Sequence, residues 1–172
     1  MHIPYRVRQF WLALFAAPTD QDLKLVQEIL SPSLTELFLQ MQPGEQAHSL
    51  QVLRRLMALG ETNPDLLVAA LLHDVGKSLY PLHIWDRVLI VIARALIPQQ
   101  AARWGCGAPT GWKKAFVVAQ QHPRWGAELA AKHAASPLAV RLILRHQDPL
   151  TSEPVSLEDR LLRQLQSVDD QS

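Results

Sequence analysis

Seven histidines and a single cysteine, Cys106, decide which metal chemistry the chain can support. One cysteine excludes an internal disulfide framework and a cysteine-rich zinc site, so a metal site must be built from imidazole and carboxylate groups. Mixed nitrogen and oxygen donors suit Mn, Fe, Mg, Co or Ni better than a structural zinc. The histidines therefore point to a site for divalent metal ions.

The sharpest motif is the stretch LLHDVGK at residues 71–77, which places His73 and Asp74 side by side. An exposed His-Asp pair at a helix end is ordinary, but this pair ends an apolar segment that we expect to be buried. Buried imidazole and carboxylate groups need partners, and a cation satisfies both. We predict that Gly76, just beyond the pair, adopts a left-handed helix cap.

Other histidines and one aspartate stand near helix ends or on inward-facing turns of predicted helices. With the His-Asp pair, the candidate ligands are His48, His73, Asp74, His122, His146 and Asp169. Six donors are too many for one ion that keeps an open coordination position. Two ions are therefore predicted, with Asp74 as the natural bridge between them. His2, His83 and His133 have no place in this pattern.

The elements that must position these donors are predicted to be helices. Leu and Ala total 49 residues against 24 for Val, Ile and Thr, and apolar residues recur at spacings of three and four. Several prolines follow a capping residue, as in Ser31-Pro32 and Ser136-Pro137. We predict a single all-α domain, with an irregular piece near 98–111. The expected helices are 5–16, 20–30, 33–41, 45–59, 64–74, 82–97, 112–120, 123–134, 137–147 and 156–168.

At the candidate ligands the sequence resembles the HD superfamily of metal-dependent phosphohydrolases. The order H…HD…H…H…D and the motifs HDVGK (73–77) and HPRWG (122–126) are specific in combination. The resemblance covers roughly residues 42–170, after an N-terminal helical segment at 1–41. It implies an HD-type bundle of about eight to ten helices, in which His48, His73, Asp74 and Asp169 hold one metal ion and Asp74, His122 and His146 a second. Asp170 is a one-residue alternative to Asp169.

The same resemblance implies catalytic roles for Asp74 and Lys77, with Lys77 contacting phosphate. Two cations would neutralise phosphate oxygens and lower the pKa of a bridging water, so that a metal-bound hydroxide attacks in line. Lys77 adds charge where the transition state gains it. Arg145 and Arg124 stand beside ligands and could bind a second phosphate, although a solvated helix face is the alternative.

Departures from known subgroups narrow the expected substrate. The run after His146 lacks the second histidine and the GYP motif of HD-GYP proteins, which argues against cyclic di-GMP hydrolysis. Trimetal relatives carry a glutamate four residues before the first ligand, whereas Glu45 lies three before His48, so we interpret it as a helix-start acid. The ligand set also resembles that of bacterial hydrolases of symmetrical diadenosine tetraphosphate. We expect a small phosphorylated substrate, in particular a nucleotide. The alternatives are a non-catalytic HD domain that binds metal and nucleotide as a regulator, and a helical scaffold.

Residues 78–115 separate the His-Asp pair from His122 and form a lid-like or inserted region. Three tryptophans and several basic residues surround an apolar helix at 88–97: Trp85, Trp104, Trp112, Arg87, Arg103, Lys113 and Lys114. The region could be a lid that stacks a nucleobase, a peripheral contact with a membrane surface, or a core or dimer helix.

Net charge and hydropathy argue against nucleic acid as a partner and against a transmembrane segment. A net charge of +1 gives no reason to expect nucleic acid, and no apolar run is long enough for a transmembrane segment. The first 17 residues only faintly resemble a signal peptide, and the single cysteine fits a reducing compartment. A cytoplasmic location is therefore expected, and a homodimer stays open.

Overall fold

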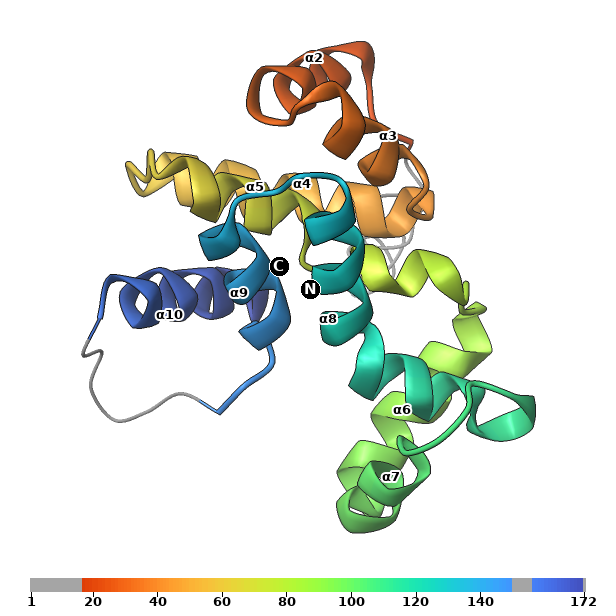
Figure 1. Cartoon of the computed structure of the whole chain (residues 1–172). Helices are drawn as coiled ribbons and strands as arrows, with labels where there is room; N and C mark the ends of the chain where they lie inside the picture. The colour runs from red at the N-terminus through yellow and green to blue at the C-terminus, as the bar shows by residue number, and fades with distance from the viewer. Residues whose placement is uncertain (1–16, 150–155, 172) are drawn as a thin grey trace, which may run out of the picture.

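The computed structural model describes residues 17–149 and 156–171, and this part of the chain is helical with no strand (Figure 1). The predicted helix 5–16 lies outside these residues. The α-helices are α2 (Asp20–Ile29), α3 (Pro32–Leu39), α4 (Pro43–Ala58), α5 (Pro64–Leu72), α6 (Ile84–Leu96), α7 (Pro98–Trp104), α8 (Lys114–Lys132), α9 (Pro137–Arg145) and α10 (Leu157–Asp169). Two 3-10 helices, η1 (Val75–Leu79) and η2 (Gly111–Lys113), complete them. The predicted all-α class is confirmed.

Proline-led helix starts account for much of this agreement. Ser31, Asn63 and Ser136 are N-cap residues, and each side chain accepts a hydrogen bond from a backbone N–H of the first turn. Proline follows each of them as the first helical residue, where its missing N–H costs nothing. These starts coincide with the predicted ones to within a residue.

Helix α8 corrects the prediction of two separate helices at 112–120 and 123–134. It runs unbroken through Pro123, which is buried inside it. Proline cannot donate to the carbonyl four residues earlier, which belongs to Ala119. The Arg94 Nη2 atom of α6 lies 3.3 Å from that oxygen and donates to it instead. A side chain from another helix thus satisfies the acceptor that Pro123 leaves free. The irregular piece predicted near 98–111 is also shorter, because it begins with α7.

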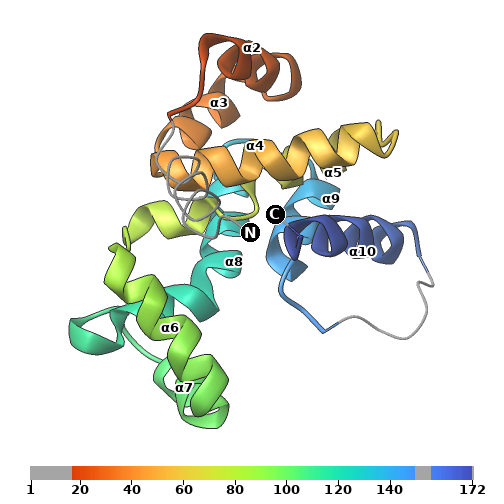
Figure 2. The same cartoon turned by 180° about the vertical axis from the view of Figure 1, so that it is seen from behind.

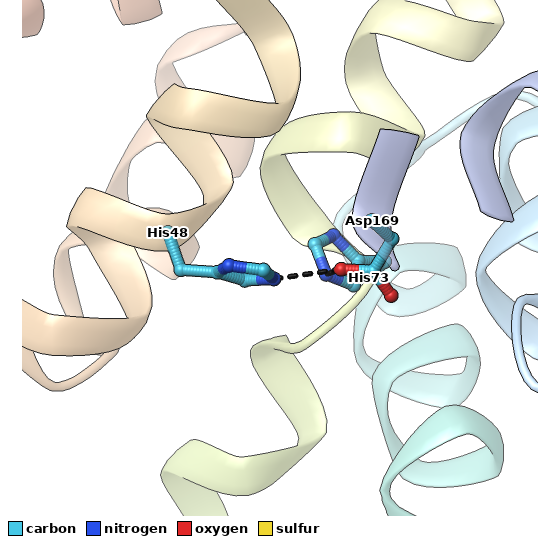
Figure 3. A group of neighbouring side chains, drawn as sticks. All are labelled: His48, His73 and Asp169. Carbon is cyan, nitrogen blue, oxygen red and sulfur yellow. Dashed lines mark hydrogen bonds and ion pairs between the residues drawn. The ribbon is translucent and has the colours of Figure 1, made fainter. Parts of the chain in front are cut away.

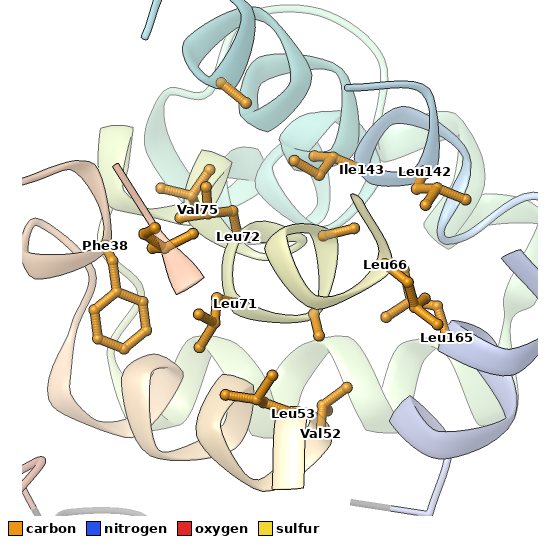
Figure 4. Close-up of a cluster of buried hydrophobic side chains, with 14 of the residues drawn as sticks. Phe38, Val52, Leu53, Leu66, Leu71, Leu72, Val75, Leu142, Ile143 and Leu165 are labelled. Atoms are coloured by element: carbon orange, nitrogen blue, oxygen red, sulfur yellow. The ribbon is translucent and has the colours of Figure 1, made fainter. Parts of the chain in front are cut away.

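The main hydrophobic core surrounds α5, whose Leu66, Leu71 and Leu72 are fully buried (Figure 4). Helices α2, α3, α4, α9, α10 and the second half of α8 supply most of the rest of this cluster, and η1 adds Val75. A second, smaller cluster joins α6 and α7 to the first half of α8 through Ile90, Ala101 and Phe116. A small second core thus joins residues 78–115 to the first half of α8. Among the described residues, no helix combines the length and apolar character needed to cross a membrane.

Gly76 does not adopt the predicted left-handed cap, because it lies inside η1 and is absent from the positive-φ glycines of the described chain. Its role is close approach instead. A Cβ atom at Gly76 would lie 2.1 Å from the His122 carbonyl oxygen and 2.7 Å from the Gly126 nitrogen. The missing side chain lets η1 press against the backbone of α8, which brings the His-Asp pair next to His122.

We expect Gly76→Ala to destabilise the fold by about 3 kcal/mol, because the new methyl group meets backbone atoms that cannot move aside. Chemical denaturation measures this loss. Gly60→Ala is the matched control: its Cβ would meet nothing within 4 Å, and only the φ of 84° opposes it. That strain costs about 1 kcal/mol. A Gly76 variant no less stable than the Gly60 variant would contradict the steric account.

Candidate metal centre

The His-Asp pair lies where α5 ends. Leu72 is the last residue of α5, His73 is its C-cap, and the chain then turns into η1. Because the last four residues of α5 are all buried, this end lies inside the molecule. His73 is 1% exposed and Asp74 is 4% exposed. Polar side chains buried to this degree must find polar partners or a cation.

Two groups of potential ligands converge there from five elements. In each group the ligand atoms lie within 4.8 Å of one another; the groups are His48, His73 and Asp169, and Asp74, His122 and His146. Figure 3 shows the first group, with His48 reaching from α4 toward Asp169 at the end of α10. All six residues predicted from the sequence are thus brought together. Asp170, the alternative to Asp169, is the exposed C-cap of α10 and belongs to neither group.

Asp74 connects the groups through its two carboxylate oxygens. Oδ1 lies 3.2 Å from His122 Nε2 and 3.9 Å from His146 Nε2. Oδ2 lies 3.7 Å from His73 Nε2 and 2.6 Å from Lys77 Nζ. In the first group, Asp169 Oδ1 lies 2.7 Å from His48 Nε2 and 3.4 Å from His73 Nε2. One carboxylate therefore faces both groups, as a bridging ligand would.

Three of the histidines use their Nδ1 atoms within their own chain segments. Each Nδ1 lies against a backbone carbonyl three or four residues earlier: His73 with Ala70 (3.0 Å), His122 with Val118 (2.9 Å) and His146 with Ile143 (2.7 Å). A carbonyl only accepts, so Nδ1 carries the hydrogen, and whenever the ring is neutral its Nε2 lone pair faces the centre. This is the arrangement that orients metal-binding histidines.

The resulting donor set fits metal ions. The Nε2 atoms of His122 and His146 face each other at 3.2 Å, and two lone pairs at that distance repel unless a cation lies between them. His73 Nε2 is buried and has no hydrogen-bond partner in the described structure. Imidazole lone pairs and carboxylates collected in one buried place are what Mn, Fe, Mg, Co or Ni would take as ligands.

The pKa shifts in the centre have the same electrostatic origin. Burial opposes a charge on His73, but the carboxylates of Asp74 and Asp169 outweigh it and raise the pKa of His73 to about 9. Burial, together with the His73 charge, lowers the pKa of His146 to about 3. Burial also opposes a charge on Asp74, yet Lys77 and His73 hold its pKa well below the usual range. The carboxylates thus attract positive charge to one place in the buried centre.

Glu45 lies beside the centre, a position that its interpretation as a helix-start acid does not predict. It does start α4, but it is also buried and pairs with two cations. Its Oε1 lies 2.5 Å from Arg87 Nη2 of α6, and its Oε2 lies 3.6 Å from Lys77 Nζ. Burial opposes the Lys77 charge, but Asp74 and Glu45 outweigh it and raise the Lys77 pKa. Positive and negative side chains thus alternate along a row of ion pairs that leads to the centre, in the order Arg87, Glu45, Lys77 and Asp74.

Two buried or partly buried amides were also missed. Gln166 of α10 donates from Nε2 to the His146 carbonyl at 2.9 Å and to the Asp148 carbonyl at 2.8 Å, which fixes the backbone after α9. The Gln147 Nε2 atom lies 3.5 Å from His122 Nε2, at the margin of the second group. Glutamine carries no distinctive spacing signal, so only the folded structure identifies these positions.

The two arginines predicted to bind substrate lie in ion pairs with carboxylates. Arg145 bonds Glu158 at 2.6 Å and Asp159 at 3.3 Å, at the start of α10. Arg124 pairs with Glu128 on the exposed face of α8 at 3.0 Å. The Arg145 contacts join α9 to α10, which carries the ligand Asp169. Neither arginine contacts the groups of candidate ligands.

Comparison with known families agrees with this geometry. The family model described as HD domain matches residues 46–169, which is most of the chain. The chain therefore belongs to the HD-domain family, within the superfamily of metal-dependent phosphohydrolases. Comparisons with curated proteins and with solved structures gave no match.

We expect Mn²⁺ to raise the Tm of the protein, because an ion that binds only the folded state stabilises it by about 2.7 kcal/mol at 100 times its Kd. His122→Gln should reduce this shift strongly, since it removes one lone pair from the second group. His83→Gln is the control, because His83 is exposed and belongs to neither group. Equal Mn²⁺ shifts in both variants, measured by thermal denaturation, would show that the group does not bind the ion.

Proposed function

We propose that the protein hydrolyses a phosphoester or phosphoanhydride bond, with divalent metal ions held by the two groups of candidate ligands. One observation supports this most: acceptor groups that require a cation meet beside a largely buried ammonium group, Lys77. A phosphate repels an incoming nucleophile, and its leaving oxygen gains charge as the bond breaks. A site rich in fixed positive charge meets both requirements.

The ligands divide between two ions in this proposal. His48, His73, Asp74 and Asp169 hold the first, and Asp74, His122 and His146 hold the second. Bound divalent ions neutralise phosphate oxygens and lower the pKa of a water molecule toward neutrality. The split contacts of Asp74 support its bridging role, because its two oxygens face different groups. The Nδ1 contacts with backbone carbonyls keep the histidine rings turned toward the ions.

Lys77 is the residue that we propose contacts the phosphate. Its side chain is 25% exposed, so it borders the buried centre and is partly open to solvent. The raised pKa keeps it charged at neutral pH. Glu45 acts as a positioning residue, because it lies between Lys77 and Arg87 and limits where the ammonium can move. Arg124 and Arg145 contact neither group of candidate ligands, so the proposal does not depend on them.

A nucleotide is the substrate class that we favour. Tyr80, three residues beyond Lys77, is partly exposed and lies against Trp125, with ring centroids 5.1 Å apart. Aromatic faces stack nucleobases, typically with about 1–3 kcal/mol per base. A phosphate held at Lys77 and a base held near this aromatic pair would together select nucleotides over simple phosphoesters.

We expect hydrolysis of a nucleotide or a generic phosphoester in the presence of Mn²⁺, and we expect Asp74→Asn to abolish it. Lys77→Met should lower kcat by about 10²-fold, the usual loss when one charge-stabilising group is removed. Lys132→Met is the control, because Lys132 is exposed at the end of α8. Phosphate release measures each rate. Equal rates for wild type and Asp74→Asn would exclude this centre, whereas nucleotide binding without turnover would indicate a regulatory domain.

Glu45→Gln should separate positioning from metal binding. The change keeps the shape but removes the charge that holds Lys77, so we expect kcat to fall roughly tenfold, as is common when outer partners of a site are lost. The Mn²⁺-induced Tm shift should stay close to that of wild type, because Glu45 belongs to neither ligand group. Loss of this shift together with the activity would instead make Glu45 part of the metal site or of the fold.

A further inference from the structure

Helix α6 exposes an apolar face that the rest of the described chain does not cover. Only Ile90 and Ala93 of α6 are buried, against α7 and α8. The exposed apolar side chains recur mostly at spacings of three and four and are Trp85, Val88, Leu89, Val91, Ile92 and Leu96. Val91 is 68% exposed and Leu96 is 75% exposed. Against the described residues, this distribution does not fit a buried core helix, one of the alternatives predicted for this region.

The exposed apolar residues concentrate in one part of the molecule. Ten of the fifteen large hydrophobic residues that are exposed in the described chain fall between Leu79 and Trp112. In both views of the molecule, α6 and α7 lie at the end opposite α2 (Figures 1 and 2). We call α6, α7 and η2 with their connections, residues 78–115, the α6–α7 unit. A large apolar patch on one projecting unit is typical of a docking surface.

The α6–α7 unit also collects positive charge. It contains five Lys and Arg residues and one Asp, a net charge of +4 in a chain whose total is +1. The remainder of the chain is therefore net negative, at −3. In the described structure, no carboxylate pairs with Arg103, Lys113 or Lys114, and Lys113 Nζ lies 5.5 Å from the ring centroid of the exposed Trp112. Lys114 Nζ donates to the Pro81 carbonyl at 2.7 Å, which does not neutralise its charge, so all three cations can attract a negatively charged partner.

We propose that the α6–α7 unit docks on an anionic phospholipid surface. The 13-residue α6 is too short to span a bilayer, but it suits a helix that lies in the plane of the headgroups with its apolar face toward the acyl chains. Trp85 and Trp112 have the amphipathic rings that favour this depth. Basic residues close to an anionic surface are attracted to its headgroups and strengthen the binding.

The charge distribution disfavours two other occupants of this face. A symmetric dimer through α6 would bring two copies of the same unit together, so that +4 would face +4. Residues 1–16 are apolar and aromatic but contain Arg6 and Arg8 and no acidic residue, so they also match the unit in charge sign. A membrane with acidic headgroups has a charge opposite to that of the unit. A second copy of the unit and residues 1–16 both carry charge of the same sign and are repelled by it.

Vesicle co-sedimentation of the full chain tests the proposal. We expect the protein to pellet with vesicles of phosphatidylcholine and phosphatidylglycerol, and roughly tenfold less with phosphatidylcholine alone. Raising the salt concentration should weaken the binding, because salt screens exposed charges. The double variant Val91→Glu/Leu96→Glu should lose vesicle binding. Leu59→Glu is the matched control, because Leu59 at the end of α4 is 69% exposed and lies outside the unit, and it should bind as wild type does.

Three outcomes would overturn the proposal. Absence of binding to anionic vesicles would do so directly. Undiminished binding by Val91→Glu/Leu96→Glu would assign the binding to another part of the chain, such as residues 1–16. A wild-type dimer, measured by light scattering, that the double variant dissociates in the absence of vesicle binding would make the face a dimer interface. Phosphohydrolase activity is measured separately in solution, so its failure does not affect this test.

Discussion

Imidazole nitrogens and carboxylates meet in one buried region of this structure. The other features of the structure depend on this constraint. Three imidazole rings give their Nδ1 hydrogens to backbone carbonyls and turn their Nε2 atoms inward, where Asp74 and Asp169 add negative charge. Such a collection is unfavourable in a protein interior unless positive charge balances it. The raised pKa of His73 and the close Lys77 ammonium are two ways in which the chain itself supplies part of that charge.

This constraint explains why packing at a distance from the ligands matters. The buried α5 carries the His-Asp pair into the interior, but the pair meets His122 only because Gly76 lets η1 touch the backbone of α8. Helix α8 in turn passes through Pro123 without a break because Arg94 satisfies the free Ala119 carbonyl. Ligand geometry therefore depends on backbone packing and on a hydrogen bond that no ligand side chain makes.

The sequence predicted those features whose physical cause is local. A capping side chain followed by proline defines a helix start within a few residues, and a histidine next to an aspartate after an apolar run is visible as a motif. The features it missed have distant causes. Nothing near Pro123 indicates that Arg94 will compensate for it, and nothing near Glu45 indicates that Arg87, 42 positions away, will pair with it. The six candidate ligands were found because they follow a known order along the chain. Glu45 follows no such order.

Net charge shows how a global sum can hide the relevant physics. A total of +1 suggests no strong attraction for any charged partner, yet it combines a unit of +4 with a remainder of −3. At the centre, attraction for phosphate depends on Lys77 and on bound cations, which no count of Lys and Arg includes. At the α6–α7 unit, it depends on cations that no nearby carboxylate neutralises. Because screening limits each field to about 10 Å or less, a partner responds to the local charge it meets and hardly at all to the total.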